Sequence, residues 1–233
     1  MIARIKKGTK WFLVFVILLV AALVSLSVYT NVSTDVTEDD AAVFAEFGLR
    51  KPAVPMSFEQ EVALIRRVQQ EFFKRAPLGE GIADYAPREP ADLMRAGHGL
   101  CYDRSRSFDK AFEFLGFESR HVYLLYQEDR SFLGALFRKG QSSHAVTEVK
   151  TSKGWMFVDS NTEWIALTPQ GEPVNADDVW RRFGEFDHAP PYLDHAWWAI
   201  RGMYSRKGHL YAPYVPFPEL NWHDFSEWLV EAL

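Results

Sequence analysis

The first thirty residues divide into a basic tail and a long apolar run. Residues 1–10 carry four Lys or Arg and no acid, whereas Trp11–Tyr29 is a run of nineteen residues without a charge. At about 1.5 Å of rise per helical residue, this run is long enough to cross a bilayer core. The pattern predicts a transmembrane anchor over 11–29, with the basic tail 1–10 in the cytoplasm. A cleaved signal peptide is the alternative, with a weak cleavage pattern at Ser25–Ser27.

Residues 30–55 are polar and then mixed, and their end contains two prolines. We therefore expect a stalk with little fixed structure. After Ser57, apolar residues recur at helical spacing and Gln60 follows three positions later, which predicts a capped helix ending near Arg75. The apolar positions are Phe58, Val62, Ile65, Val68 and Phe72.

The segment 56–165 continues with a mixture of helical and alternating patterns. Residues 89–95 favour a short helix, and residues 102–115 favour a longer one that ends at Gly116. Three short apolar strands follow at 121–126, 144–150 and 155–159, the last two joined as a hairpin. The sequence thus predicts an α+β core over 56–165. Residues 127–142 form a charged loop between strands, which is a candidate lid.

Beyond this core, residues 166–233 are punctuated by prolines and rich in aromatic residues. Five of the eight tryptophans lie between Trp180 and Trp228. We expect this extension to pack on the core, with some Trp and Tyr at the membrane interface. A groove for a carbohydrate or peptide is the less favoured interpretation.

The net charge and the cysteine content limit the classes of function that this protein can have. The net charge of −5 becomes −9 once the +4 tail is set aside (−5 − 4 = −9), which argues against nucleic-acid binding. The only cysteine is Cys101, so an intrachain disulfide is impossible. An unpaired cysteine is unusual outside the cytoplasm, where the anchor would place the body. Cys101 is therefore a candidate nucleophile.

The surroundings of Cys101 suit a reactive thiol. It lies between a glycine-containing turn and a helix start, where unpaired N–H groups and the helix dipole favour a thiolate. His144 opens a strand and is the best candidate base. If the hairpin loop has two or four residues, Val146 faces Asp159, and Asp159 comes within reach of His144. A three-residue loop would separate them.

This order of Cys, His and Asp on a helix and two adjacent strands resembles the transglutaminase-like superfamily. The resemblance covers about residues 57–165. Its motifs are Gly99-Leu100-Cys101-Tyr102-Asp103-Arg104-Ser105, then His144-Ala145-Val146-Thr147-Glu148-Val149, and Gly154-Trp155-Met156-Phe157-Val158-Asp159; Pro90–Gly97 also resembles the approach to the family's cysteine.

The resemblance implies a papain-like α+β core with the nucleophile helix packed on an antiparallel sheet. It also implies Cys101 as nucleophile, His144 as general base and acid, and Asp159 as the group that orients the imidazole. Many members place a Trp or Gln upstream of the cysteine to complete the oxyanion hole. No Trp lies between Trp11 and Cys101, and the upstream glutamines Gln60, Gln69 and Gln70 lie on the predicted helix.

Other polar residues have ordinary explanations. Asp103 is a substrate contact or, preferably, a first-turn acid that interacts with the helix dipole. His98 is a less favoured substrate contact. The C-terminal histidines have acidic neighbours, but their spacing matches no metal motif, so we expect neither metal nor cofactor. These histidines are His188, His195, His209 and His223.

The sequence therefore predicts a membrane-anchored thiol enzyme whose body lies outside the cytoplasm, in the bacterial periplasm or at the cell surface. Its substrate would be a peptide, protein or other amide, and hydrolysis is favoured over transamidation. The alternative is a non-catalytic binding or scaffold module of the same fold in a cell-envelope assembly.

Overall fold

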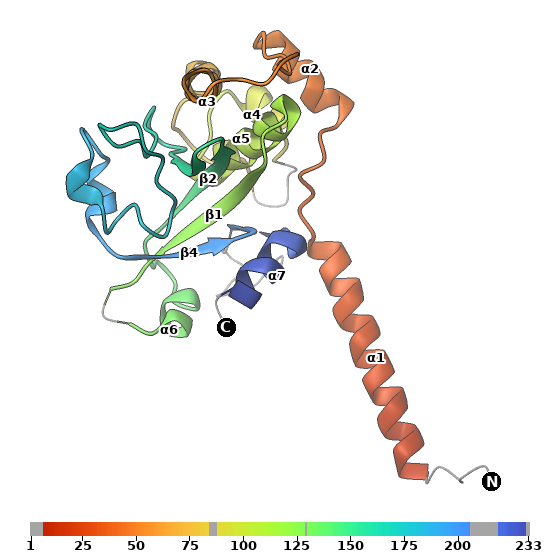
Figure 1. Ribbon diagram of the computed structural model, residues 1–233. Coiled ribbons are helices and arrows are strands. Elements are labelled where there is room, and N and C mark those ends of the chain that lie inside the picture. Colours follow the sequence, from red (N-terminus) through yellow and green to blue (C-terminus); the bar gives the residue numbers. More distant parts are fainter. Residues whose placement is uncertain (1–6, 84–87, 129, 206–218, 232–233) are drawn as a thin grey trace.

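The structure is a computed structural model that describes residues 7–83, 88–128, 130–205 and 219–231. Its centre is a four-stranded antiparallel sheet with the strand order β3-β2-β1-β4 (Figure 1). The predicted mixture of helices and an antiparallel sheet is thus confirmed. The strands are β1 (Ser119–Tyr126), β2 (Ser143–Thr151), β3 (Gly154–Val158) and β4 (Trp197–Arg201).

Three helices pack together beside the sheet, and their apolar side chains form its main core. The side chains of Ser57 and Gln60 cap the first of them reciprocally, as predicted. Phe72 and Phe108 meet edge to face in this core, with ring centroids 5.4 Å apart. Among the described elements, the helix that begins at Cys101 has the most buried residues. The helices are α3 (Phe58–Arg75), α4 (Pro90–Ala96) and α5 (Cys101–Leu115).

A second core lies under the irregular chain that follows β3. Val174, Val179 and Leu193 pack there against β1 and β2 side chains such as Leu124 and Val146. This segment contains short 3₁₀ turns rather than regular strands, because prolines and hydrogen-bonded turns interrupt it. The 3₁₀ turns are Phe183–Glu185 and Pro191–Asp194.

The C-terminal part is more than an extension packed on a finished core. β4 pairs with β1 over Tyr126↔Trp197 to Val122↔Arg201, so it belongs to the central sheet. The expected boundary at residue 165 is therefore wrong, since the sheet needs a strand from beyond it. The remaining described elements are α6 (Phe132–Leu136), which lies within the predicted loop 127–142, β5 (Met203–Ser205), β6 (Glu219–Leu220) and α7 (Trp222–Glu231). Residues 206–218 lie outside the described part.

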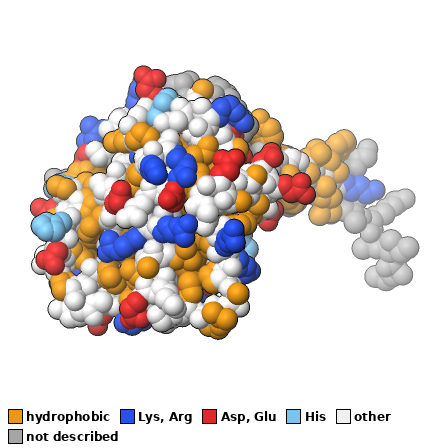
Figure 2. Space-filling view, turned by 90° about the horizontal axis from the view of Figure 1, so that it is seen from above, with side chains coloured by type: hydrophobic (Ala, Val, Ile, Leu, Met, Phe, Trp, Pro, Cys, Tyr) orange, Lys and Arg blue, Asp and Glu red, His pale blue; other side chains and the backbone are white. Residues whose placement is uncertain are grey.

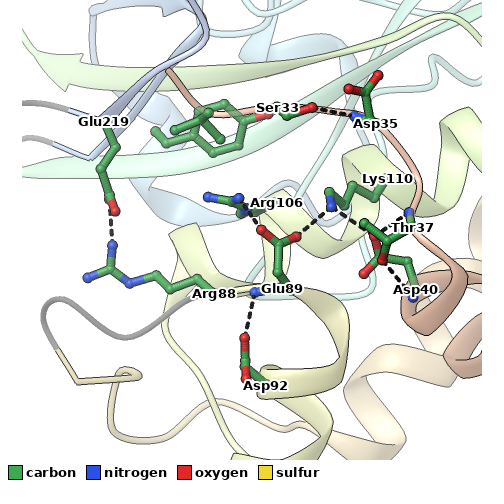
Figure 3. Close-up of polar contacts among 12 residues, drawn as sticks. Ser33, Asp35, Thr37, Asp40, Arg88, Glu89, Asp92, Arg106, Lys110 and Glu219 are labelled. Atoms are coloured by element: carbon green, nitrogen blue, oxygen red, sulfur yellow. Dashed lines mark hydrogen bonds and ion pairs between the residues drawn. The ribbon is translucent and has the colours of Figure 1, made fainter. Parts of the chain in front are cut away.

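The prediction of a loose stalk over 30–55 is also wrong. Residues of this segment form α2 (Glu38–Glu46), and Phe44, Phe47 and Leu49 are buried in the main core. Figure 3 shows how polar contacts hold it: Lys110 of α5 binds Asp40 at 2.8 Å and Glu89 at 2.5 Å. The sequence misled because α2 has only nine residues, so its apolar positions span too few turns to show a periodic pattern.

The N-terminal helix stands apart from the body. α1 (Lys7–Thr30) projects away from it, and the stretch Thr9–Tyr29 is apolar enough and long enough to span a membrane, with a mean hydropathy of 2.8 (Figure 1). None of this stretch is buried against the rest of the protein. Of the expected cytoplasmic tail 1–10, residues 1–6 lie outside the described part.

Candidate active site

Cys101 occupies the first position of α5 and is partly exposed. The turn before it is tight: a Cβ at Gly99 would lie 2.6 Å from Leu93 Cδ1, so a larger residue there would displace the Leu93 side chain. The carboxylate of Asp103 accepts the backbone N–H of Leu100 at 2.9 Å and that of Ile82 at 3.2 Å. Asp103 therefore stabilises the helix start, which agrees with its predicted interaction with the helix terminus rather than with a substrate contact.

His144 and Asp159 meet because of the hairpin register. Thr147 pairs with Val158 and Thr151 with Gly154, leaving a two-residue loop at 152–153, so the register predicted from the sequence is confirmed. His144 Nε2 lies 2.7 Å from Asp159 Oδ1. Both side chains are almost completely buried, and their hydrogen bond is therefore shielded from water.

Asp159 is held as an anion by several donors. Thr162 Oγ1 donates to Oδ2 at 2.6 Å, and the backbone N–H of Asn161 donates to Oδ1 at 3.1 Å. Burial by itself raises the pKa of Asp159, but the hydrogen bond and charge of His144 together with these donors bring that pKa below its usual value. The charged form of Asp159 is therefore the stable one.

The imidazole of His144 also interacts with the Cys101 thiol, and each group shifts the pKa of the other. Asp159 occupies Nε2 of this imidazole, so Nδ1 is the ring nitrogen that Asp159 leaves free. Burial disfavours the charged forms of both groups, but their polar contacts outweigh this effect. Asp159 and Cys101 raise the pKa of His144. His144 and the N–H groups of Ala145 and Tyr102 lower the pKa of Cys101. These opposite shifts favour a thiolate–imidazolium pair.

Arg104 joins the two sides of this arrangement, and the sequence prediction gave it no role. Its guanidinium is completely buried and donates to the carbonyl oxygens of Gly99 at 2.6 Å and Ser160 at 2.5 Å, and to Asn161 Oδ1 at 2.6 Å. The turn before Cys101 is thereby tied to the loop after Asp159. A sequence signal existed, because Arg104 precedes Phe108 and Ala111 at helical spacing and so lies on the buried face of α5.

The side chain of Gln69 is also hydrogen-bonded to the loop that follows β3. Its Nε2 donates to the carbonyl oxygens of Asp159 at 2.8 Å and Trp164 at 2.9 Å. Gln60 is engaged in the helix cap. Neither contact set is that of an oxyanion donor, and Gln69 instead positions the chain that carries the carboxylate.

Aromatic rings from the C-terminal part lie beside the imidazole. Tyr192 stands edge-on to His144, with ring centroids 4.8 Å apart at 70°. The ring contacts continue in a chain, with centroid distances of 6.1 Å from Tyr192 to Trp197 and 5.4 Å from Trp197 to Tyr126. The last contact joins Tyr126 to His195 at 5.1 Å. There they reach an open cavity of about 680 Å³, whose lining is Tyr126, Gln127, Glu128, Arg130, Asp194, His195 and Ala196. Sequence analysis missed this proximity because it depends on β4.

The other predicted polar candidates are not gathered at this site. His98 Nδ1 is engaged by the carbonyl oxygen of Glu80 at 2.7 Å. His223 lies on α7 beside Asp224, and His209 is outside the described residues. Within the described ranges, no group of three or more His, Cys, Asp or Glu is arranged to hold a metal ion.

Comparison with known proteins finds one matching family model. Residues 53–160 match the family model described as the transglutaminase-like superfamily. This segment is therefore similar to a transglutaminase-like domain. The matched range contains Cys101, His144 and Asp159, and it ends one residue after Asp159. The predicted transglutaminase-like fold is thereby confirmed for the domain, which β4 completes from outside the matched range.

Among solved structures, the chain is similar to one titled a "Putative Cysteine Protease" from Cytophaga hutchinsonii. The two are 13% identical, the match covers 59% of this chain and 42% of that one, and the TM-score is 0.38. The present chain thus spans less than half of that protein. No curated protein is similar to the chain in sequence.

Proposed function

We propose that the protein is a cysteine enzyme that cleaves an amide or peptide bond through Cys101, His144 and Asp159. One observation carries the proposal: the buried imidazole of His144 is hydrogen-bonded to the carboxylate after β3, and the same imidazole lowers the pKa of the thiol at the start of α5. A buried cysteine with only a structural role needs neither partner. The opposite pKa shifts of Cys101 and His144 fit a nucleophile stored as a thiolate.

The reaction begins when the thiolate attacks the carbonyl carbon of the substrate. Backbone N–H groups at the start of α5 stabilise the resulting oxyanion. The C–N bond then breaks, the imidazolium of His144 gives its proton to the leaving amine, and a thioester to Cys101 remains. His144 next takes a proton from water, the hydroxide attacks the thioester, and the acid leaves as the thiolate re-forms. Asp159 stabilises the imidazolium and fixes its orientation.

Water is the proposed second substrate, because hydrolysis requires no acceptor site. The open cavity lined by Tyr126 and His195 is linked to His144 through the rings of Trp197 and Tyr192, and we propose it as the place where an extended substrate continues beyond His144. Its lining of charged and amide side chains favours a polar substrate such as a peptide over an apolar one. No cofactor takes part in this scheme.

We further propose that α1 anchors the protein in a membrane with the body outside the cytoplasm. The apolar stretch Thr9–Tyr29 supports the anchor, and the basic residues before it support the orientation. The bacterial periplasm or cell surface is the compartment that this orientation implies.

Alkylation of the full chain tests the proposal, since Cys101 is its only thiol and every adduct reports on it. The protein is held in lipid nanodiscs, and the rate of iodoacetamide labelling is measured against pH for wild type and His144→Ala. We expect rapid labelling of the wild type near neutral pH, and a midpoint in the variant that rises toward about 8.5, the ordinary value for cysteine.

Slow labelling that His144→Ala leaves unchanged would overturn the enzyme proposal. The non-catalytic binding module of the same fold would then become the preferred function. Labelling of His98→Ala, whose ring contacts the carbonyl oxygen of Glu80 instead, is the matched control and should follow the wild type.

A further inference from the structure

The short helices α6 and α7 expose large apolar side chains. Leu133 is 62% exposed and Phe137 is 55% exposed at α6, while Leu229 is 44% exposed and Val230 is 75% exposed on α7. Outside α1, four of the six large exposed hydrophobic residues of the described chain lie on these two helices or, for Phe137, directly after α6. Exposed apolar side chains that cluster in this way indicate a surface that another apolar phase covers.

The two helices form one fixed unit. Phe132 of α6 contacts Trp228 of α7 at 6.2 Å and Trp198 of β4 at 5.5 Å between ring centroids. Leu125 and Ile200 of the sheet lie in the same cluster. Since the inner faces of both helices are packed, the exposed residues belong to their outer faces and are held in place.

The same unit is attached directly to the end of α1. Val32 donates its N–H to the Leu220 carbonyl at 2.7 Å, and Asn221 Nδ2 donates to the Val32 carbonyl at 3.0 Å. The first N–H of α7, that of Trp222, is bonded to Asn31 Oδ1 at 3.2 Å. No flexible linker therefore separates the apolar helix from α7.

The arrangement places the exposed residues on the side of the body from which α1 leaves. In Figure 1, α6 and α7 lie below the sheet, toward α1, whereas α2 and α3 lie at the opposite end. That opposite face carries basic and acidic side chains spread over much of its area (Figure 2). A bilayer crossed by α1 would meet the body at α6 and α7.

We infer that α6 and α7 dock on the surface of the membrane that α1 crosses, with Leu133, Phe137, Leu229 and Val230 inserted at the interface. The inference rests on the proposed anchor. α7 carries Asp224, Glu227 and Glu231, so the fitting partner is a leaflet of neutral headgroups. Docking would hold the body in one orientation and restrict the active site to substrates close to the membrane.

Site-specific crosslinking to lipid tests this inference on the full chain in phosphatidylcholine nanodiscs. The photoreactive residue p-benzoylphenylalanine is placed singly at Leu133 and at Val230. Phe15 within α1 is the positive control. Val54 is the matched negative control, because it is 72% exposed but lies between α2 and α3 at the far end. We expect lipid adducts at Phe15, Leu133 and Val230, and none at Val54.

The outcomes separate the docking from the anchor. Adducts at Phe15 but none at Leu133 or Val230 would overturn the docking and leave the anchor standing. Absence of adducts at Phe15 as well would overturn both. Crosslinks from Leu133 or Val230 to a second copy of the chain would instead assign the surface to a dimer. Cys101 alkylation should be unchanged in all of these variants, because none touches the active site.

Discussion

The Arg104 guanidinium donates a hydrogen bond to the Gly99 carbonyl oxygen at 2.6 Å and another to the Ser160 carbonyl oxygen at 2.5 Å. Gly99 lies two residues before Cys101, and Ser160 follows Asp159 directly. One buried side chain thus connects the turn before Cys101 to the loop after Asp159. Its charge also lies within electrostatic reach of Cys101 and Asp159.

Replacing Arg104 with lysine should weaken both the fold and the site. A single ammonium cannot reach Gly99, Ser160 and Asn161 together, and each buried acceptor left without a donor costs about 1–3 kcal/mol. We expect a lower free energy of unfolding in urea and a higher pH midpoint for Cys101 alkylation. Arg95→Lys, at a 73% exposed side chain, is the control and should change neither. A midpoint equal to that of wild type would show that Arg104 is structural only.

Asp159→Asn tests the electrostatic role of the carboxylate with little change in shape. In the wild type Asp159 raises the pKa of His144, so the imidazolium persists to higher pH and keeps the Cys101 pKa low. Removing the negative charge should lower the pKa of His144 and raise that of Cys101, moving the alkylation midpoint upward by about 1 pH unit or more. Asp178→Asn, at a half-exposed carboxylate paired with Arg181, should leave the midpoint where it is. An unshifted midpoint in Asp159→Asn would contradict the assignment.

Lys110→Met tests whether the segment that carries α2 is part of the fold. The ammonium of Lys110 lies between Asp40 and Glu89, and its removal leaves the buried carboxylate of Asp40 without its cation, whereas Glu89 keeps Arg106 (Figure 3). Breaking such a pair from one side costs about 3–5 kcal/mol. The matched control is Lys150→Met, whose ion pair with Glu118 is exposed and should contribute about 0–1 kcal/mol. Urea unfolding measures both, and equal small losses would mean that α2 contributes little.

Asp109 should make the fold less stable as pH rises. Burial raises the pKa of Asp109 to about 7, although Ser119 and Tyr204 donate hydrogen bonds to it. The folded state therefore holds this proton more tightly than the unfolded chain. The resulting stability is full below the ordinary pKa of 3.8 and is lost as pH rises through about 7.

The variant Asp109→Asn removes this titration. Its stability relative to wild type should rise between pH 5 and pH 8, as measured by urea unfolding at each pH. Asp177→Asn, whose carboxylate is about half exposed, serves as the control for the general effect of removing an acid. A constant difference between Asp109→Asn and wild type across this range would contradict the proposed proton on Asp109.

Local patterns determined much of this protein. The capped helix α3, the helix that begins at Cys101 and the hairpin register all follow from residues close together in the chain. The contact between His144 and Asp159 was predictable for the same reason, because a two-residue loop settles which residues share a face. The long apolar helix before residue 30 was also predictable from the sequence, by its length and composition.

The tertiary structure decided the features that depend on distant contacts. The burial of α2 rests on Asp40 meeting Lys110, seventy residues away, and β4 joins the sheet by pairing with β1 across the aromatic segment. Arg104 and Tyr192 reach the active site only through such long-range packing. Periodicity indicates which face of an element is buried but not which other element covers that face. These contact partners are therefore determined only by the tertiary structure.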